Sequence, residues 1–139
     1  MSKVSLTKEV SVPIQNFYSV VADFESYPEF ISEIKQAKVI SQKPKRVEFT
    51  LELIKTFHYI LEFKEKSSSE VSWKLVESNL FQKNTGGWKL KEKNGVLDVT
   101  YTLDVEFGFL VPSFITNPMV KRDLPKMIER FEARALAVS

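Results

Sequence analysis

The chain has 139 residues, of which 43% are hydrophobic and 27% charged, and its formal net charge is +2. This composition excludes a disordered chain, and the interspersed positive and negative residues do not indicate a DNA-binding protein. Because the chain has no cysteine, disulfides, thiolate nucleophiles and zinc sites built on sulfur are excluded as well.

The first predicted element is a strand over residues 4–12. Its apolar residues stand at even positions: Val4, Leu6, Val10 and Val12. Lys8 interrupts this alternation. Either its side chain extends from a sheet edge toward water, which we favour, or it lies at the mouth of a cavity.

Two short helices are expected after this strand. Pro13 can serve as the first residue of a helix, and the apolar residues that follow recur at helical spacing: Ile14, Phe17, Tyr18, Val21 and Ala22. A second helix is expected to begin at Ser26, which forms a capping box with Glu29 three residues later. Its apolar side comprises Phe30, Ile31 and Ile34.

From about residue 37 apolar residues recur at every second position, which predicts six further strands joined by hairpins. One face of the resulting sheet is expected to be exposed to water. The turns are expected at Lys43-Pro44-Lys45-Arg46, Ser67-Ser68-Ser69 and Asn94-Gly95, and the last is the strongest hairpin signal. Residues expected to face inward include Val47, Phe49, Leu51, Leu53, Tyr59, Leu61, Phe63, Val71, Trp73, Leu75, Trp88, Leu90, Leu97, Val99, Tyr101, Leu103, Val105 and Phe107.

The last element is a long helix whose apolar stripe has a 3.6-residue period: Val120, Leu124, Met127, Ile128, Phe131, Ala135 and Val138. Asn117 is expected as its N-cap, with Pro118 at the first helical position and a short turn over residues 112–115 before it. Pro125 lies inside the stripe, so we expect a kink near Lys121 and Arg122.

This order of elements predicts an α+β fold with one domain over residues 1–139. The apolar stripe of the long helix must be buried against the apolar face of the sheet. We therefore expect a seven-stranded antiparallel sheet that wraps around the C-terminal helix and leaves space beneath it, with two short helices between the first two strands.

Several local motifs resemble those of one superfamily when they are taken in chain order. They are Val12-Pro13, Val20-Val21-Ala22-Asp23, Tyr27-Pro28-Glu29-Phe30, Gly87-Trp88 and Phe131-Glu132-Ala133-Arg134-Ala135. Over nearly its whole length the chain resembles the START and Bet v 1-like (SRPBCC) helix-grip superfamily, whose bacterial members include polyketide cyclase/dehydrase and lipid-transport proteins. The most similar branch contains coenzyme-Q-binding proteins and the ribosome-association toxin.

The resemblance implies a hydrophobic ligand in a cavity between the sheet and the long helix. The residues expected to line it are Phe30, Tyr59, Leu61, Trp73, Leu75, Trp88, Tyr101, Leu103, Phe114, Met119, Val120, Met127 and Phe131. Tyrosine and tryptophan would orient the ligand through their polar atoms, although simple core packing explains each residue equally well. The mouth is expected near Phe30, Phe81, Phe109, Leu110 and Phe114.

The sequence contains no evident catalytic apparatus. His58 is the single histidine and is expected to point away from the core, and the wet-face carboxylates Asp98, Asp104 and Glu106 are expected to be solvated. We find no phosphate-binding loop, serine elbow or metalloprotease motif. We therefore expect no cofactor and no metal.

Three functions remain open at this stage. The first is non-enzymatic binding or transport of a lipid, isoprenoid quinone or polyketide-like aromatic. The second is an interaction module that contacts a ribosome or membrane surface through the basic turn at residues 43–46 or the apolar segment Phe109-Leu110-Val111 near Phe114. The third is an aromatase/cyclase-type enzyme using Tyr59 or Tyr101. No apolar leader or membrane-length apolar stretch is evident, so we expect a cytoplasmic protein.

Overall fold

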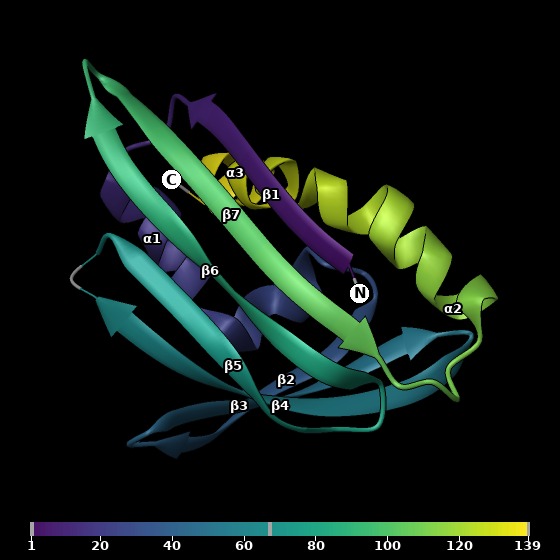
Figure 1. Cartoon of the computed structure of the whole chain (residues 1–139). Helices are drawn as coiled ribbons and strands as arrows, with labels where there is room; N and C mark the ends of the chain where they lie inside the picture. Colours follow the sequence, from purple (N-terminus) through teal and green to yellow (C-terminus); the bar gives the residue numbers. More distant parts are fainter. Residues whose placement is uncertain (1, 67, 139) are drawn as a thin grey trace.

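The computed structural model describes residues 2–66 and 68–138, so Ser67 of the predicted serine turn lies outside the described residues. Seven strands form one antiparallel sheet in the order β1-β7-β6-β5-β4-β3-β2. They are β1 (Ser2–Val10), β2 (Ile34–Gln42), β3 (Lys45–Leu53), β4 (Lys55–Lys66), β5 (Glu70–Ser78), β6 (Phe81–Lys93) and β7 (Val96–Phe107). Figure 1 shows the sheet curving around the helices, which confirms the helix-grip α+β fold.

The helical elements fall in two groups. Between β1 and β2 lie α1 (Ile14–Ala22) and the 3-10 helix η1 (Phe24–Glu29). After β7 come α2 (Ser113–Pro118), the π-helix η2 (Met119–Asp123), the 3-10 helix η3 (Leu124–Lys126) and α3 (Met127–Val138). Within the part of the chain that the structure describes, no helix is long and apolar enough to cross a membrane.

Alternating side chains divide each strand into a core face and an outer face. In β7 the residues at odd positions from Leu97 to Val105 are buried, as the sequence pattern predicts. The β6–β7 turn confirms the Asn94-Gly95 hairpin, because Asn94 (φ 52°) and Gly95 (φ 83°) both adopt the left-handed conformation that this tight turn requires.

The second short helix differs from its prediction. It is a 3-10 helix that begins at Phe24, so Ser26 lies inside it and caps nothing. The helix ends at Glu29, so Phe30 and Ile31 follow it and Ile34 starts β2. The Tyr27 hydroxyl donates a hydrogen bond to the Val21 carbonyl oxygen at 2.6 Å, and this contact holds the tight turn against α1.

The C-terminal helical segment begins earlier than predicted. Its first residue is Ser113, and the Ile115 and Thr116 amides donate to the Pro112 carbonyl, so the expected turn over residues 112–115 is helical and Asn117 is no N-cap. Near Lys121 and Arg122, where a kink was predicted, a π-helix and a 3-10 turn separate α2 from α3. Pro125 lacks the amide hydrogen that a regular helix needs at that position.

The core lies between the inner face of the sheet and the two helical groups. In α3, Ile128, Phe131 and Ala135 are buried, whereas Val138 at the end of the predicted stripe is 56% exposed. Val138 is exposed because it occupies the last turn of the helix. Phe17 on α1 is fully buried and packs edge-on against Trp88 at 5.6 Å between ring centroids.

Candidate ligand-binding cavity

A cavity of about 120 Å³ lies between the sheet and the C-terminal helical segment. Some of its lining residues were expected from the sequence: Tyr59, Leu61, Trp73, Trp88, Tyr101, Leu103, Met119, Met127 and Phe131. Phe81, which was expected near the mouth, also lines it. The remaining lining residues were not among those expected: Tyr27, Ile31, Glu33, Ile34, Phe49, Leu51, Phe63, Asn84, Val105, Asp123 and Leu124. The structure thus brings side chains from most of the sheet and from η2, η3 and α3 to one space.

Four of the expected residues lie outside this lining. Phe30 is half-buried and packs edge-on against Phe131, with ring centroids 5.0 Å apart. Leu75 and Val120 are also half-buried and pack against the core cluster. Phe114 is 63% exposed on the outer side of α2. Helical periodicity could not place Phe114 because the helix starts earlier than expected.

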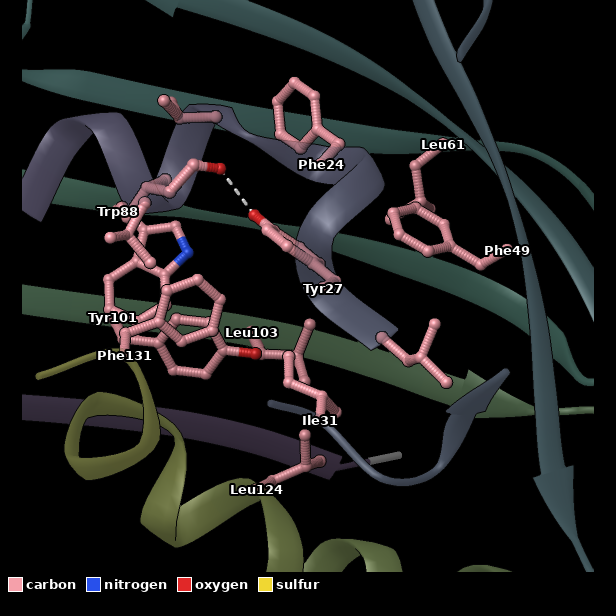
Figure 2. Packing of buried hydrophobic residues seen from close by; sticks show 14 of the residues in the cluster. Phe24, Tyr27, Ile31, Phe49, Leu61, Trp88, Tyr101, Leu103, Leu124 and Phe131 are labelled. Atoms are coloured by element: carbon pink, nitrogen blue, oxygen red, sulfur yellow. Dashed lines mark hydrogen bonds between the residues drawn. The ribbon is translucent and has the colours of Figure 1, made fainter. Parts of the chain in front are cut away.

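Aromatic rings form much of the cavity wall. The ring centroid of Trp88 lies 4.6 Å from that of Tyr101 and 4.6 Å from that of Phe131, and Phe49 stacks on Tyr59 at 5.1 Å. Figure 2 shows Trp88, Tyr101 and Phe131 grouped beside α3, with Phe49 toward the opposite side. Such rings offer a large apolar surface and lose little side-chain entropy on contact with a ligand.

Gly86 explains how the Trp73 indole reaches its place. Trp73 on β5 pairs in register with Gly86 on β6, and a Cβ atom at Gly86 would lie 2.7 Å from the indole. The missing side chain therefore leaves room for the ring beside β6. From there the Trp73 Nε1–H donates a hydrogen bond to Asn84 Oδ1 at 2.9 Å.

The polar atoms of the cavity wall differ in how they are bonded. Among described residues, Tyr59 and Tyr101 make no hydrogen bond through their hydroxyl groups, whereas the Tyr27 hydroxyl is bonded to Val21. Burial raises the pKa of both Tyr59 and Tyr101 above the ordinary tyrosine range. Both hydroxyls therefore stay protonated near neutral pH and can donate hydrogen bonds.

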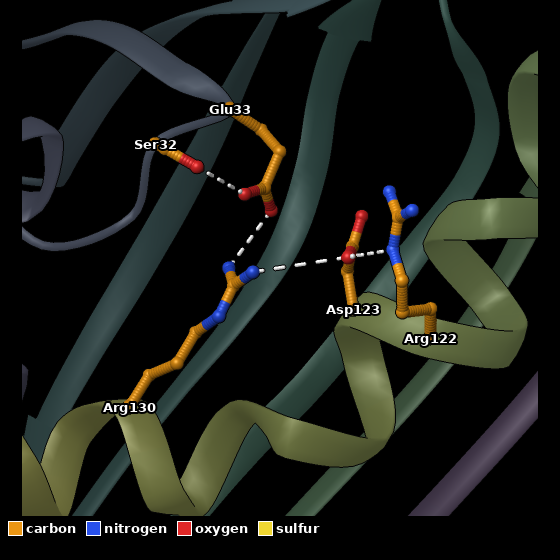
Figure 3. A network of polar contacts seen from close by, with 5 residues as sticks. All are labelled: Ser32, Glu33, Arg122, Asp123 and Arg130. Atoms are coloured by element: carbon orange, nitrogen blue, oxygen red, sulfur yellow. Dashed lines mark hydrogen bonds and ion pairs between the residues drawn. The ribbon is translucent and has the colours of Figure 1, made fainter.

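A charged network borders the same cavity and joins the η1–β2 connection to the C-terminal helical segment. Arg130 Nη1 lies 2.8 Å from Glu33 Oε2, and Arg130 Nη2 lies 3.8 Å from Asp123 Oδ1 (Figure 3). Arg122 Nε also lies 3.0 Å from Asp123 Oδ1. Burial alone would raise the pKa of Glu33, but hydrogen bonds from Arg130 and Ser32 and the Arg130 charge hold it below its ordinary value.

We expect Arg130→Met to destabilise the fold by about 2 kcal/mol at neutral pH, because it leaves two largely buried carboxylates without their shared partner. The lowered pKa of Glu33 means that its contribution is present above the unfolded-state pKa and is lost as the pH falls through the folded-state pKa. The difference in the free energy of unfolding between Arg130→Met and wild type should therefore become smaller at acidic pH. Urea denaturation at several pH values measures it.

Arg122→Met is the matched control, since Arg122 contacts the same Asp123 but its side chain is 68% exposed. The Arg122 guanidinium is largely in water and Asp123 keeps Arg130 as a partner, so this variant should stay within about 0.5 kcal/mol of wild type. Equal effects of the two substitutions, or an Arg130→Met effect that does not change with pH, would contradict the structural role assigned to the network.

Other sequence candidates lie away from the cavity. His58 is exposed as predicted, with Nδ1 3.3 Å from Thr50 Oγ1. The Lys8 ammonium reaches from edge strand β1 to Glu132 on α3 at 2.7 Å. The carboxylates Asp98, Asp104 and Glu106 lie outside the cavity lining. Asp104 is not simply solvated as expected, because its Oδ2 pairs with Lys83 Nζ at 2.8 Å and its Oδ1 is buried. In the described ranges, 2–66 and 68–138, no three histidine, aspartate or glutamate side chains gather at a metal-binding distance.

The basic turn and the apolar connection are also clear in the structure. Arg46 pairs with Glu62 at 3.1 Å, so part of the basic turn is already neutralised. Phe109 and Leu110 are 86% and 84% exposed after β7. This connection therefore forms an exposed apolar patch.

Comparisons with known proteins agree with the fold. The chain belongs to the polyketide cyclase/dehydrase and lipid transport family, whose model matches residues 10–132. Among curated proteins, no sequence matches the chain.

Solved structures share the fold at low sequence identity. A START superfamily protein from Mycobacterium smegmatis is 21% identical with a TM-score of 0.83, and all of both chains is covered. A protein from Thermus thermophilus is 16% identical with a TM-score of 0.81, and 99% of each chain is covered. The Zhui aromatase/cyclase from Streptomyces sp. R1128 is 12% identical with a TM-score of 0.68, over 97% of this chain and 86% of that one.

Proposed function

We propose that this protein binds or carries a hydrophobic small molecule, such as a lipid, an isoprenoid quinone or a polyketide-like aromatic, without transforming it. The observation that carries the proposal is the cavity itself, whose wall is mostly aromatic and aliphatic. Apolar cavities with a few polar atoms are typical small-molecule sites. Burial of ligand surface would drive binding at roughly 25 cal/mol per Å² before the costs of association.

The size of the cavity limits the ligand. Its volume of about 120 Å³ is below the roughly 300–1,000 Å³ of pockets that hold drug-sized molecules. A single ring, or the end of a longer molecule, fits this space. Met119 and Met127 belong to the C-terminal helical segment and line the cavity from that side. Their flexible side chains can rearrange around a larger ligand.

For the aromatase/cyclase alternative, the described residues that line the cavity include no free base. Its two tyrosines stay protonated because burial raises the pKa of both hydroxyls, so they favour hydrogen bonding to a ligand over proton abstraction. Glu33 and Asp123 are both paired with Arg130. Contact with a ribosome or a membrane through the exposed patch stays a prediction.

Filling the cavity tests the proposal. Leu103 is buried and lines the cavity, so Leu103→Trp should occupy the ligand's space and weaken binding at least about tenfold. Ligand-observed NMR with 1-naphthol and a short-chain quinone measures this effect. Leu136→Trp, at an exposed position of α3, is the matched control and should bind like wild type.

Two results would overturn the proposal. One is that neither compound binds the wild-type protein. The other is that Leu103→Trp, shown by circular dichroism to be folded, binds both compounds as well as Leu136→Trp does.

A further inference from the structure

Three neutral side chains give the apolar cavity an unusual polar character. Tyr59, Asn84 and Tyr101 all line it and are only 9%, 5% and 4% exposed. A buried polar group that makes no hydrogen bond destabilises the fold, so such groups normally find a partner. In this cavity each of the three keeps at least one hydrogen-bonding group without a partner among the described residues.

The orientation of the Asn84 amide follows from chemistry. Trp73 Nε1–H can only donate, so the atom that it contacts at 2.9 Å must be the amide oxygen of Asn84. The Nδ2 group of Asn84 is then left as a donor, and it makes no hydrogen bond within residues 2–66 and 68–138. Asn84 therefore offers hydrogen-bond donors to whatever occupies the cavity.

The two tyrosine hydroxyls add further donors. Tyr27 also lines the cavity, but its hydroxyl is already used on the Val21 carbonyl. Tyr59 and Tyr101 make no such contact in the described chain, and burial keeps both protonated. The free Nδ2 group of Asn84 can only donate, and the two protonated tyrosine hydroxyls can donate as well, so the three groups together match an acceptor oxygen on a ligand.

The charges at the cavity argue against an anionic ligand. Glu33 and Asp123 line it, whereas no lysine, arginine or histidine belongs to the described lining. The nearby Arg130 is already shared between these two carboxylates. Asp123 is also paired with Arg122, so both described arginines of this network are already used. A ligand carboxylate would lose its hydration and would find no unpaired cation in the described lining to compensate.

We propose that the ligand is an uncharged ring compound whose carbonyl-type oxygen accepts hydrogen bonds from the set Tyr59, Asn84 and Tyr101, and that carboxylates of similar shape are excluded. This inference rests on the proposed binding function and narrows it to one chemical class.

Three compounds of nearly identical shape test the inference: acetophenone, its alkene isostere α-methylstyrene, and benzoate. Their affinities are measured at neutral pH by ligand-observed NMR with wild type, Tyr59→Phe, Tyr101→Phe and the double variant. Tyr18→Phe is the matched control, because Tyr18 lies on α1 outside the cavity lining. The quantity of interest is the ratio of acetophenone affinity to α-methylstyrene affinity, which cancels differences in general hydrophobicity and fold stability.

We expect this ratio to fall about three- to tenfold in the double variant, which corresponds to the loss of one neutral hydrogen bond, and to stay unchanged in Tyr18→Phe. Benzoate should bind at least about tenfold more weakly than acetophenone. If the double variant does not fold, the two single variants provide the same comparison.

The outcomes separate the inference from the function on which it rests. If wild type binds acetophenone and α-methylstyrene but the ratio is the same in all variants, the inference is wrong while the binding function stands. Benzoate binding as tightly as acetophenone would also overturn it. If none of the three compounds binds wild type and the larger probes fail as well, the proposed function itself is wrong.

Discussion

Phe131→Ala should destabilise the protein by about 3–5 kcal/mol, which is a large part of the total stability of a domain of this size. Phe131 is 2% exposed, and its ring contacts those of Trp88, Phe30 and Tyr27 at centroid distances of 4.6, 5.0 and 5.3 Å. Its removal would enlarge a cavity that already exists and would separate α3 from η1. Urea denaturation of both proteins at the same pH measures the difference.

Phe109→Ala makes the same chemical change at a side chain that is 86% exposed. It should change the free energy of unfolding by less than about 0.5 kcal/mol, because the ring is already in water. Similar losses of stability for the two variants would mean that the packing of α3 against the sheet is not as described.

Gly86→Ala should lower the free energy of unfolding by about 2–3 kcal/mol, although it adds a single methyl group. The new Cβ would collide with the Thr102 carbonyl oxygen and lie 2.7 Å from Trp73 Cζ2. The collision with the Thr102 carbonyl strains the β6–β7 pairing, and the Trp73 indole must shift to make room for the new methyl group. That shift would also weaken its hydrogen bond to Asn84, and it should change the tryptophan fluorescence spectrum.

Gly108→Ala is the matched control for this prediction. The nearest atoms to an added Cβ are 3.7 Å away, on Leu80 and Val111, which is an ordinary van der Waals distance. Its stability should change by less than about 1 kcal/mol. If Gly86→Ala proved equally harmless, the close approach of Trp73 to β6 would be wrong.

Strand residues of the site could be predicted from the sequence because alternation fixes which face each side chain occupies. Tyr59, Leu61, Tyr101 and Leu103 follow this rule and line the cavity. Asn84 follows it too, since it lies two and four residues before Gly86 and Trp88 on β6. It was overlooked because a polar residue is not expected on an apolar face.

Other parts of the site depend on features that alternation does not encode. A register shift between Phe81 and Lys83 places both Phe81 and Asn84 on the inner face of β6. The network of Glu33, Asp123 and Arg130 joins residues 97 positions apart in the sequence. Such a contact arises only when the sheet has curved around the helical segment.

Helix ends were the least predictable elements. Asn117-Pro118 has the form of a helix start, yet both residues lie inside the C-terminal helical segment. The segment accommodates its prolines through a π-turn and a 3-10 turn, and this irregular stretch supplies Met119, Asp123 and Leu124 to the cavity. The departure from regular helix is thus part of the candidate site.

Native mass spectrometry of the gently purified protein, before and after incubation with quinones, lipids and aromatic ketones, tests the central claim most directly. The account predicts an added mass that corresponds to one uncharged apolar molecule per chain and that is absent in Leu103→Trp. A bare protein mass in every sample, with no uptake of any compound, would contradict a ligand-binding role for the cavity.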